Sequence, residues 1–485
     1  MKRLAVTLAM LVPLGGCTVG PDYRQPPALT DATATLTSGA ETAFDDLAPL
    51  PDHWWQLYQD PVLNGLEERA LARNTDLRVA VASLEQAQAT LRGIQRQRQP
   101  QASLSLNPTY GQASGDANGY TFGLKPGAVY TGLESVSYDL DLFGRLRRSI
   151  EASTADVGAA QAAIDLARVN VAASTAQAYA TACAAGLEIA VTRRSMDIAQ
   201  ETVRVSQRRF DAGIAGINDV VRARTLLRQT EAGLPVLLAR QRSALFTLAT
   251  LTGERPEAFP PEVARCAMPP AIRQPIPIGD GAALLARRPD VRQAERRLAG
   301  TVARIGVSTA ALYPSITLGG MLGTEATRLP DIVKDRAFTW SAGPLVSWSV
   351  PNRGLARAQI EASNAAARGA LASFDGTVLT ALRETDSALA ALARQLDTER
   401  ELAAARDDAA SANRNTARLY AGGIGAFLDT LDAERTLIGA ETSLAQATAQ
   451  VSQDQIALFL ALGGGWQDAP PVAATTLAPV AVPRR

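Results

Sequence analysis

The sequence predicts an α+β chain built from two copies of one unit, in which long helices flank pairs of short strands. Residues 73–106 reappear about 214 residues later as residues 287–320, and a register of about 210 residues then holds to the end of each copy. Residues 147–210 and 355–420 are alanine-rich and free of proline, as expected of long helices. Four shorter stretches alternate apolar and polar residues, as strands do.

Matching landmarks run through both copies, so the repeat is a duplicated tertiary unit and not merely a shared helical composition. Asp76 aligns with Asp290 near the start of the copies, and Asp219 aligns with Asp429 near their ends. The other matches are Pro100 with Pro314, Gly144 with Gly354, Gly213 with Gly423, and Leu248 with Leu458. Any account of function must therefore use this unit twice.

The segments outside the copies are connectors. The two copies span residues 51–253 and 287–464, and a proline-rich linker, residues 254–286, joins them. Residues 17–50 are rich in proline, alanine and threonine, which predicts an extended tether. The tail, residues 465–485, has no helical period, and we expect it to be disordered.

Each copy has the order helix, two strands, helix, helix. The first copy predicts helices at residues 76–99, 147–210 and 219–251. The second copy repeats the two longer ones at residues 355–420 and 429–462. The helix before the strands and the last helix of a copy are together about as long as the single long helix, so they can stack end to end beside it in a rod of about 90–100 Å.

Glycine-rich reversals, residues 213–218 and 422–426, precede the last helix of each copy. Gly233 and Pro235 should kink the helix that follows the first reversal. Helices so rich in alanine bury little apolar area of their own. We therefore expect neighbours from other copies or other chains, and a monomeric, spectrin-like bundle is the alternative.

The strand segments carry a membrane signature. In residues 130–142 and 340–350 the even positions are mostly apolar or aromatic, and the odd positions are mostly small or polar; residues 104–110 and 316–322 repeat this pattern more weakly. Alternation over about 10 residues is typical of an outer-membrane β-barrel, and a half-buried soluble sheet is the alternative. Four strands cannot enclose a lumen, and lipid does not tolerate an open sheet edge. We therefore expect the chain to oligomerise into a transmembrane β-barrel.

The N-terminus has the form of a bacterial lipoprotein signal. Two basic residues precede the apolar residues 4–14, and Cys17 stands where cleavage would leave a new N-terminus. We expect residues 1–16 to be removed, and a diacylglycerol and an acyl chain to be attached to Cys17. An ordinary signal peptide followed by a chance cysteine is the alternative. Thr18, in place of the aspartate of an inner-membrane retention signal, favours the outer membrane.

Composition excludes several classes of function. The 48 basic and 48 acidic residues balance, which argues against a nucleic-acid partner. After the signal, no apolar stretch reaches the roughly 18 residues of a transmembrane helix.

Cys183 and Cys266 are predicted to be unpaired thiols, with a disulfide as the alternative. His53 is the only histidine, and no nucleophile–base pair, phosphate loop or zinc spacing is present, so we predict neither an enzyme nor a cofactor or metal site.

Five motifs carry a resemblance to a known family. They are Cys17-Thr18-Val19-Gly20-Pro21-Asp22-Tyr23, Trp54-Trp55, Asp60-Pro61-Val62-Leu63, Asn74-x-Asp76-Leu77 and Leu428-Asp429-Thr430-Leu431-Asp432-Ala433-Glu434-Arg435. With these the chain resembles the outer-membrane channel lipoproteins of tripartite, RND-type efflux pumps, in the outer membrane factor family related to the type I secretion tunnel. Glu434 stands where that family commonly has glutamine. The resemblance implies a homotrimer whose strands complete a β-barrel and whose helices complete a periplasmic α-barrel.

The resemblance also implies a gate at the periplasmic tip. Leu428 and Asp432 are four residues apart and lie on one helix face. In three copies they would form an apolar ring and a carboxylate ring around the lumen. Arg435, one turn beyond Asp432, would hold the helix pair shut through ion pairs that must break on opening. A solvated pair of Asp432 and Arg435 at the start of a helix is the alternative.

The predicted function is a passive exit duct for drugs or other small molecules. By the resemblance, a periplasmic adaptor and an inner-membrane transporter would recruit the duct, in the outer membrane of a Gram-negative bacterium. Two alternatives remain. One is a type I secretion outlet for polypeptides, against which the lipid anchor argues. The other is a periplasmic coiled-coil adaptor, against which the presence of two hairpins argues.

Overall fold

The computed structural model describes residues 18–467 and 472, apart from residues 27–42, 46–47, 280, 349–352 and six positions between 113 and 124. The predicted signal peptide, the lipidation site Cys17 and most of the predicted disordered tail lie outside the described residues. The chain divides into two compact units. Unit 1 comprises residues 1–26, 84–160 and 294–374, and unit 2 comprises residues 27–83, 161–293 and 375–485.

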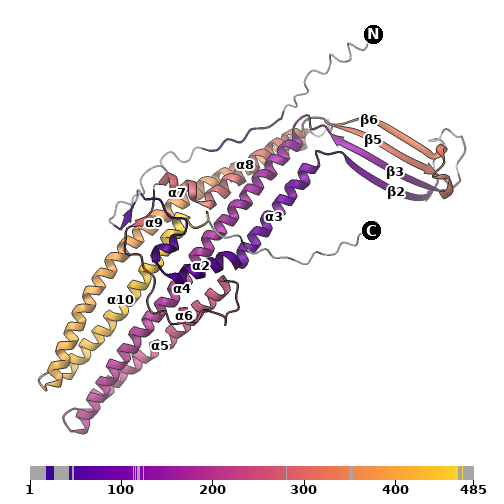
Figure 1. Cartoon of the computed structure of the whole chain (residues 1–485). Coiled ribbons are helices and arrows are strands. Elements are labelled where there is room, and N and C mark those ends of the chain that lie inside the picture. Colours follow the sequence, from indigo (N-terminus) through magenta and orange to yellow (C-terminus); the bar gives the residue numbers. More distant parts are fainter. Residues whose placement is uncertain are drawn as a thin grey trace. The chain divides into compact units, whose positions relative to one another are not determined.

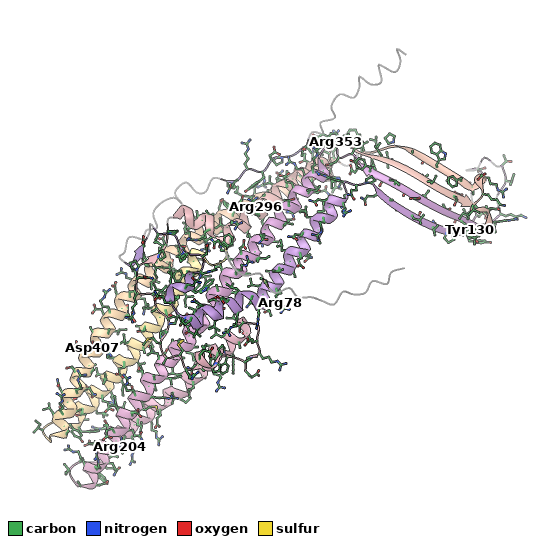
Figure 2. The ribbon with its side chains drawn as sticks, viewed as in Figure 1. Arg78, Tyr130, Arg204, Arg296, Arg353 and Asp407 are labelled. Atoms are coloured by element: carbon green, nitrogen blue, oxygen red, sulfur yellow. A yellow bond between two sulfur atoms is a disulfide. The ribbon has the colours of Figure 1, made fainter. Side chains whose placement is uncertain are left out.

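Unit 1 contains a four-stranded antiparallel sheet with the strand order β2-β3-β5-β6 (Figure 1). The strands are β2 (Gln101–Gly111), β3 (Gly127–Asp139), β5 (Ser315–Ala326) and β6 (Phe338–Ser347). The central pairing of β3 with β5, in which Val136 lies opposite Gly320, joins the two copies of the repeat. In Figure 2, Arg353 lies where the sheet meets the helices of this unit, and Tyr130 lies at the other end of the sheet.

The sheet is exposed on both faces. Every residue of β2 and β6 is exposed, and the side chains of Leu104 and Trp340 are 73% and 74% exposed. Within the described chain, each of these two edge strands has only one neighbour. Apolar side chains so exposed on long strands contradict a half-buried soluble sheet, and they mark surfaces that another molecule or lipid covers.

The predicted strand over residues 130–142 ends earlier than expected. β3 stops at Asp139 because Asp141 (φ 43°) begins the turn into the next helix. The Asp141 carboxylate accepts hydrogen bonds from the backbone N–H groups of Leu146 (2.8 Å) and Arg147 (2.9 Å), and it thereby caps that helix. The apolar residues that extend the alternation beyond Asp139 are therefore not part of the strand.

The predicted helices are present. The first copy has α3 (Thr75–Arg96), α4 (Arg145–Asp211) and α5 (Ile217–Leu251). The second copy has α8 (Pro289–Ala310), α9 (Arg353–Ala421) and α10 (Phe427–Leu462). α4 and α9 contain 67 and 69 residues, and α5 continues as a helix through Pro235. Among the described helices, none carries an apolar stretch long enough to cross a membrane.

The core of unit 2 is built from aromatic residues at the start of the first copy and from small residues of the long helices. Trp54, in the turn η2 (Trp54–Tyr58), stacks on Phe459 of α10 with ring centroids 4.6 Å apart. The helix α2 (Pro61–Arg73) contributes Leu63 and Leu66, which are fully buried. Ala172 and Ala176 of α4 are also fully buried, and their small size lets the neighbouring segments approach closely.

The prediction of two unpaired thiols is wrong, because Cys183 and Cys266 form a disulfide with their Cα atoms 4.8 Å apart. The linker returns to α4 across 83 residues of sequence and lies directly on Gly186. A side chain at Gly186 would overlap the carbonyl group of Cys266, so the glycine creates the space for this close approach. The linker also pairs with the N-terminal tether, because β1 (Phe44–Asp45) lies parallel to β4 (Ile276–Pro277).

Candidate functional site

The two helix reversals of unit 2 have the same backbone geometry. In the first, Gly213 has φ 73°, and the N–H groups of Ile214 and Ala215 donate to the carbonyl of Arg209. In the second, Gly423 has φ 80°, and the N–H groups of Ile424 and Gly425 donate to the carbonyl of Leu419. A left-handed glycine that closes a helix end in this way explains why both copies place glycine at this position.

A small core lies behind these reversals and joins the hairpin α4–α5 to the hairpin α9–α10. It consists of Ala223, Leu226, Tyr420, Phe427 and Leu431, with Val203, Val205 and Ile438 packed against it. Arg209 of α4 donates to the carbonyl of Tyr420 (3.0 Å), and its guanidinium lies 4.3 Å from the centre of the Tyr420 ring. The first hairpin therefore holds the end of α9 by a hydrogen bond and a cation–π contact.

A second link between the hairpins is a buried carboxyl group. Glu434 of α10 is 1% exposed, and one of its oxygens accepts a hydrogen bond from the Thr202 hydroxyl of α4 (2.9 Å). The other oxygen, Oε1, has no partner among the described residues. Burial raises the pKa of Glu434, although the bond from Thr202 opposes that rise.

The predicted gate residues lie on the opposite side of α10 from this core. Leu428 is 54% exposed, and Asp432 and Arg435 are also exposed. Because residues 428, 432 and 435 follow the helical period, they form one stripe, whereas Leu431 and Glu434 face the core. In the described part of the chain, no ion pair links Asp432 to Arg435.

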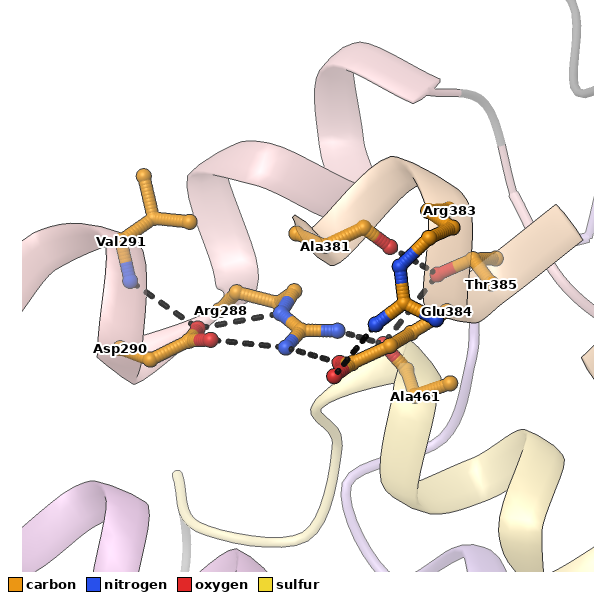
Figure 3. Close-up of polar contacts among 8 residues, drawn as sticks. All are labelled: Arg288, Asp290, Val291, Ala381, Arg383, Glu384, Thr385 and Ala461. Atoms are coloured by element: carbon orange, nitrogen blue, oxygen red, sulfur yellow. Dashed lines mark hydrogen bonds and ion pairs between the residues drawn. The ribbon is translucent and has the colours of Figure 1, made fainter. Parts of the chain in front are cut away.

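The start of the second copy is fastened to the end of α10 by a buried arginine (Figure 3). Arg288, 9% exposed in its side chain, donates to Asp290 (2.7 Å), to Glu384 of α9 (2.9 Å) and to the carbonyl of Ala461 (2.7 Å). Burial alone would lower the pKa of Arg288, but its bonds to Asp290 and Glu384 raise it overall. Arg287 beside it donates to the carbonyl of Leu462 (2.9 Å). Two carbonyls at the C-terminus of α10 thus gain charged donors.

The first copy fastens the corresponding helix end with an amide. Asn74 donates to the carbonyl of Leu251 at the end of α5 (3.1 Å). Its side-chain oxygen accepts from the N–H groups of Asp76 (2.8 Å) and Leu77 (3.3 Å), which caps α3. The start of α3 therefore lies against the end of α5, as the predicted end-to-end stacking requires, and α8 and α10 meet in the same way.

The only histidine of the sequence, His53, lies beside an aromatic ring. His53 packs against the Trp55 ring, 5.1 Å between centroids, in the segment that precedes α2. The described part of the chain contains no group of three or more histidine, cysteine or acidic residues arranged to hold a metal ion.

The sequence did not reveal Arg288, because its acidic partner Glu384 lies 96 residues away and only the tertiary fold brings them together.

The duplicated chain combines an open sheet, exposed on both faces, with two helical hairpins that are bonded to each other. These features are those of a subunit of an outer-membrane channel. The chain belongs to the outer membrane efflux protein family, whose model matches residues 66–254 and 282–464. These two matched segments cover most of both copies of the repeat.

Individual proteins agree with this assignment along nearly the whole chain. The chain is 30% identical to nodulation protein T of Rhizobium leguminosarum bv. trifolii, over 93% of this chain and 95% of that protein. It is 29% identical to the solvent efflux pump outer membrane protein SrpC of Pseudomonas putida, over 96% and 99% of the two chains. The solved structure of the outer-membrane channel OprN is similar with a TM-score of 0.87 and 35% identity, covering 93% of this chain and 100% of that one.

Proposed function

We propose that three copies of this chain form the exit duct of an efflux pump, through which small molecules leave a Gram-negative cell. The observation that carries this proposal is the sheet, because four strands with exposed faces and two unpaired edges cannot stand alone in lipid. Pairing β6 of one chain with β2 of the next removes every edge. In this proposal the duct is passive, and the inner-membrane partner supplies the energy for export.

The proposed partners follow from membership of the family. A periplasmic adaptor and an inner-membrane transporter would deliver the exported molecule, and the relative SrpC is named as the outer membrane protein of a solvent efflux pump. Drugs and other small molecules are the substrate class proposed here. We further propose that Cys17 carries a diacylglycerol and an acyl chain, which add a membrane anchor to the strands.

The gate is proposed at Leu428, Asp432 and Arg435. Their exposed stripe on α10 supports this assignment, because side chains that no part of the described chain covers are free to face a lumen or a neighbouring subunit. Leucine rings favour dewetting of a narrow passage, and carboxylate rings favour cations over anions. Opening would then require the Arg435 contacts between subunits to break.

Two measurements test the duct. Protein extracted from the outer membrane should run as a heat-resistant trimer on a gel, and it should conduct ions in planar bilayers.

For the gate, the double variant Asp432→Asn, Arg435→Gln should raise single-channel conductance. Asp397→Asn, Arg400→Gln is the matched control, since it removes an exposed aspartate–arginine pair at the same spacing on α9 (3.1 Å). Conductance that is equal in both double variants would exclude the gate while leaving the duct intact.

A further inference from the structure

The segment that follows Cys17 is bound to unit 1. Arg148, near the start of α4, has a side chain that is only 4% exposed. Its guanidinium donates to the carbonyls of Val19 (3.2 Å) and Gly20 (3.2 Å) and to the carboxylate of Asp22 (2.7 Å). One buried guanidinium thus donates hydrogen bonds to three acceptors within four residues of the segment. Hydrogen bonds from a charged donor are stronger than those between neutral groups.

Further contacts extend this binding along the segment. The Val19 N–H donates to the carbonyl of Phe143 (3.3 Å), in the turn between β3 and α4. The Tyr23 hydroxyl donates to the carboxylate of Glu295 on α8 (3.0 Å), and burial together with this bond raises the pKa of Tyr23. Glu295 is itself 7% exposed, so the structure holds a buried polar partner at each end of the segment.

Two glycines allow the segment to approach this closely. Gly20 has φ 89°, and a side chain there would overlap the backbone of Gly306 on α8. Gly144, φ 75°, lies against Thr18, so a side chain at Gly144 would also collide with the segment. Any residue other than glycine at position 20 would be strained by the positive φ, and its side chain would collide with Gly306.

We propose that Arg148, Glu295 and Gly306 form an intramolecular receptor for residues 18–23, and that this receptor fixes the position of the lipid-bearing end of the chain beside the junction of strand and helix. This inference rests on the proposed lipidation of Cys17. With Val19 held, two peptide units of about 3.8 Å each separate the cysteine from a fixed point of unit 1. If residues 18–26 were free, these nine residues alone would let the same cysteine move over about 30 Å. Arg148 is a positioning residue, because it acts on the anchor through the segment and not by contact with lipid.

The physical consequence concerns assembly. Acyl chains fixed beside the start of α4 and the strands of the sheet enter the membrane at one point of the molecule. A subunit that is anchored there presents its edge strands to its neighbours at a constant depth, so fewer arrangements have to be searched before the barrel closes. A free tether would anchor the chain equally well and would give no such alignment.

Hydrogen exchange measured by mass spectrometry on the purified, full-length protein tests the receptor. In the wild type, the peptide that contains residues 18–26 should be protected. Arg148→Met should accelerate its exchange at least about tenfold, since it removes the charged donor that holds Val19, Gly20 and Asp22. Arg145→Met is the matched control, because Arg145 lies one turn away on α4 and makes only an exposed pair with Asp139 (2.8 Å). It should leave this exchange unchanged.

Gly20→Ala is the second variant, and it changes no residue of α4 or of the sheet. It should accelerate exchange of the same peptide as Arg148→Met does, while exchange within α4 stays as in the wild type. Both variants should also lower the fraction of heat-resistant oligomer in the outer membrane relative to Arg145→Met. Unprotected residues 18–26 in the wild type would overturn the receptor. Accelerated exchange with normal assembly would overturn its positioning role.

Failure of lipidation gives a different result. The mass of the N-terminal peptide reports directly whether Cys17 is acylated. In Cys17→Ser the receptor contacts remain, so protection of residues 18–26 should persist even though the anchor is lost. An unmodified Cys17 would therefore refute the lipid anchor without affecting the exchange result, and unprotected residues 18–26 would refute the receptor without affecting the lipid.

Discussion

The two copies of the repeat share their fold and differ in how they are fastened. At the joint where the strand-leading helix meets the end of the last helix, the first copy uses the neutral Asn74 and the second uses the charged Arg288. Gly253 and Gly463 follow the helix end in both copies, with φ 76° and 67°. The first copy has in addition a disulfide at Cys183, where the repeat register places Ala393 in the second. Duplication thus preserved backbone geometry, while each copy acquired its own means of stabilisation.

The largest effect should come from the disulfide, which only the first copy has. Reduction of Cys183–Cys266 releases a loop with a sequence separation of 83 residues, which should lower the free energy of unfolding by about 4 kcal/mol. Denaturant unfolding of the detergent-solubilised protein with and without a reductant measures this. The double variant Cys183→Ala, Cys266→Ala is the control, and it should no longer respond to the reductant.

Arg288 should give the next largest effect. Arg288→Met removes a buried charged donor from Asp290, from Glu384 and from the carbonyl of Ala461, and it should destabilise unit 2 by about 3 kcal/mol. Thermal unfolding followed by circular dichroism reports the loss. Arg383→Met is a suitable control. Arg383 pairs with the same Glu384, but its side chain is 67% exposed and the pair is longer, at 3.6 Å. An equal loss in both variants would show that the buried joint has no special importance.

Asn74→Ala should cost less, about 2 kcal/mol, because it removes neutral hydrogen bonds that cap α3 and α5 but leaves no charge unpaired. The same unfolding measurement applies. The comparison of the two joints predicts that the Arg288→Met variant has a lower free energy of unfolding than the Asn74→Ala variant. The reverse order would contradict the comparison. The additional variant Arg288→Asn tests whether the amide of the first copy can serve in the second.

The smallest effect concerns Glu434, whose counterpart in the first copy is the exposed Arg224. Because burial raises the folded-state pKa of Glu434, the folded protein binds the proton more tightly than the unfolded chain does. Its stabilising contribution is complete below the unfolded pKa and is lost as pH rises through the folded pKa. Glu434→Gln should therefore add up to about 1 kcal/mol at pH 8 and almost nothing at pH 4. Arg224→Gln should show no such dependence on pH.

The sequence predicted the long helices well because they depend on local properties. Absence of proline, high alanine content and apolar spacing act within one segment, so the limits of α4 and α9 were predicted to within two residues. The strands were predicted from their alternation, but the end of β3 depends on the Asp141 cap, which the alternation pattern does not contain.

Features that depend on distant residues were not predictable in this way. The disulfide requires the linker to return to Gly186, and the joint at Arg288 requires α9 and α10 to meet there. The gate residues were singled out through family resemblance, and the structure adds that they form one exposed stripe. The role of the segment after Cys17 was hidden, since the motif gives no indication that Arg148 lies more than a hundred residues further along the chain.

Engineered crosslinks between the edge strands test the central claim most directly. Cysteines replace Ser103 on β2 and, one at a time, Thr339, Ser341 and Gly343 on β6, since the native Cys183–Cys266 pair leaves no other thiol in the described chain. Oxidation in intact outer membranes should give covalent dimers and then closed trimers for at least one pairing, and no larger species. Monomers alone at every pairing, or a ladder that continues beyond three chains, would contradict a barrel completed by three copies.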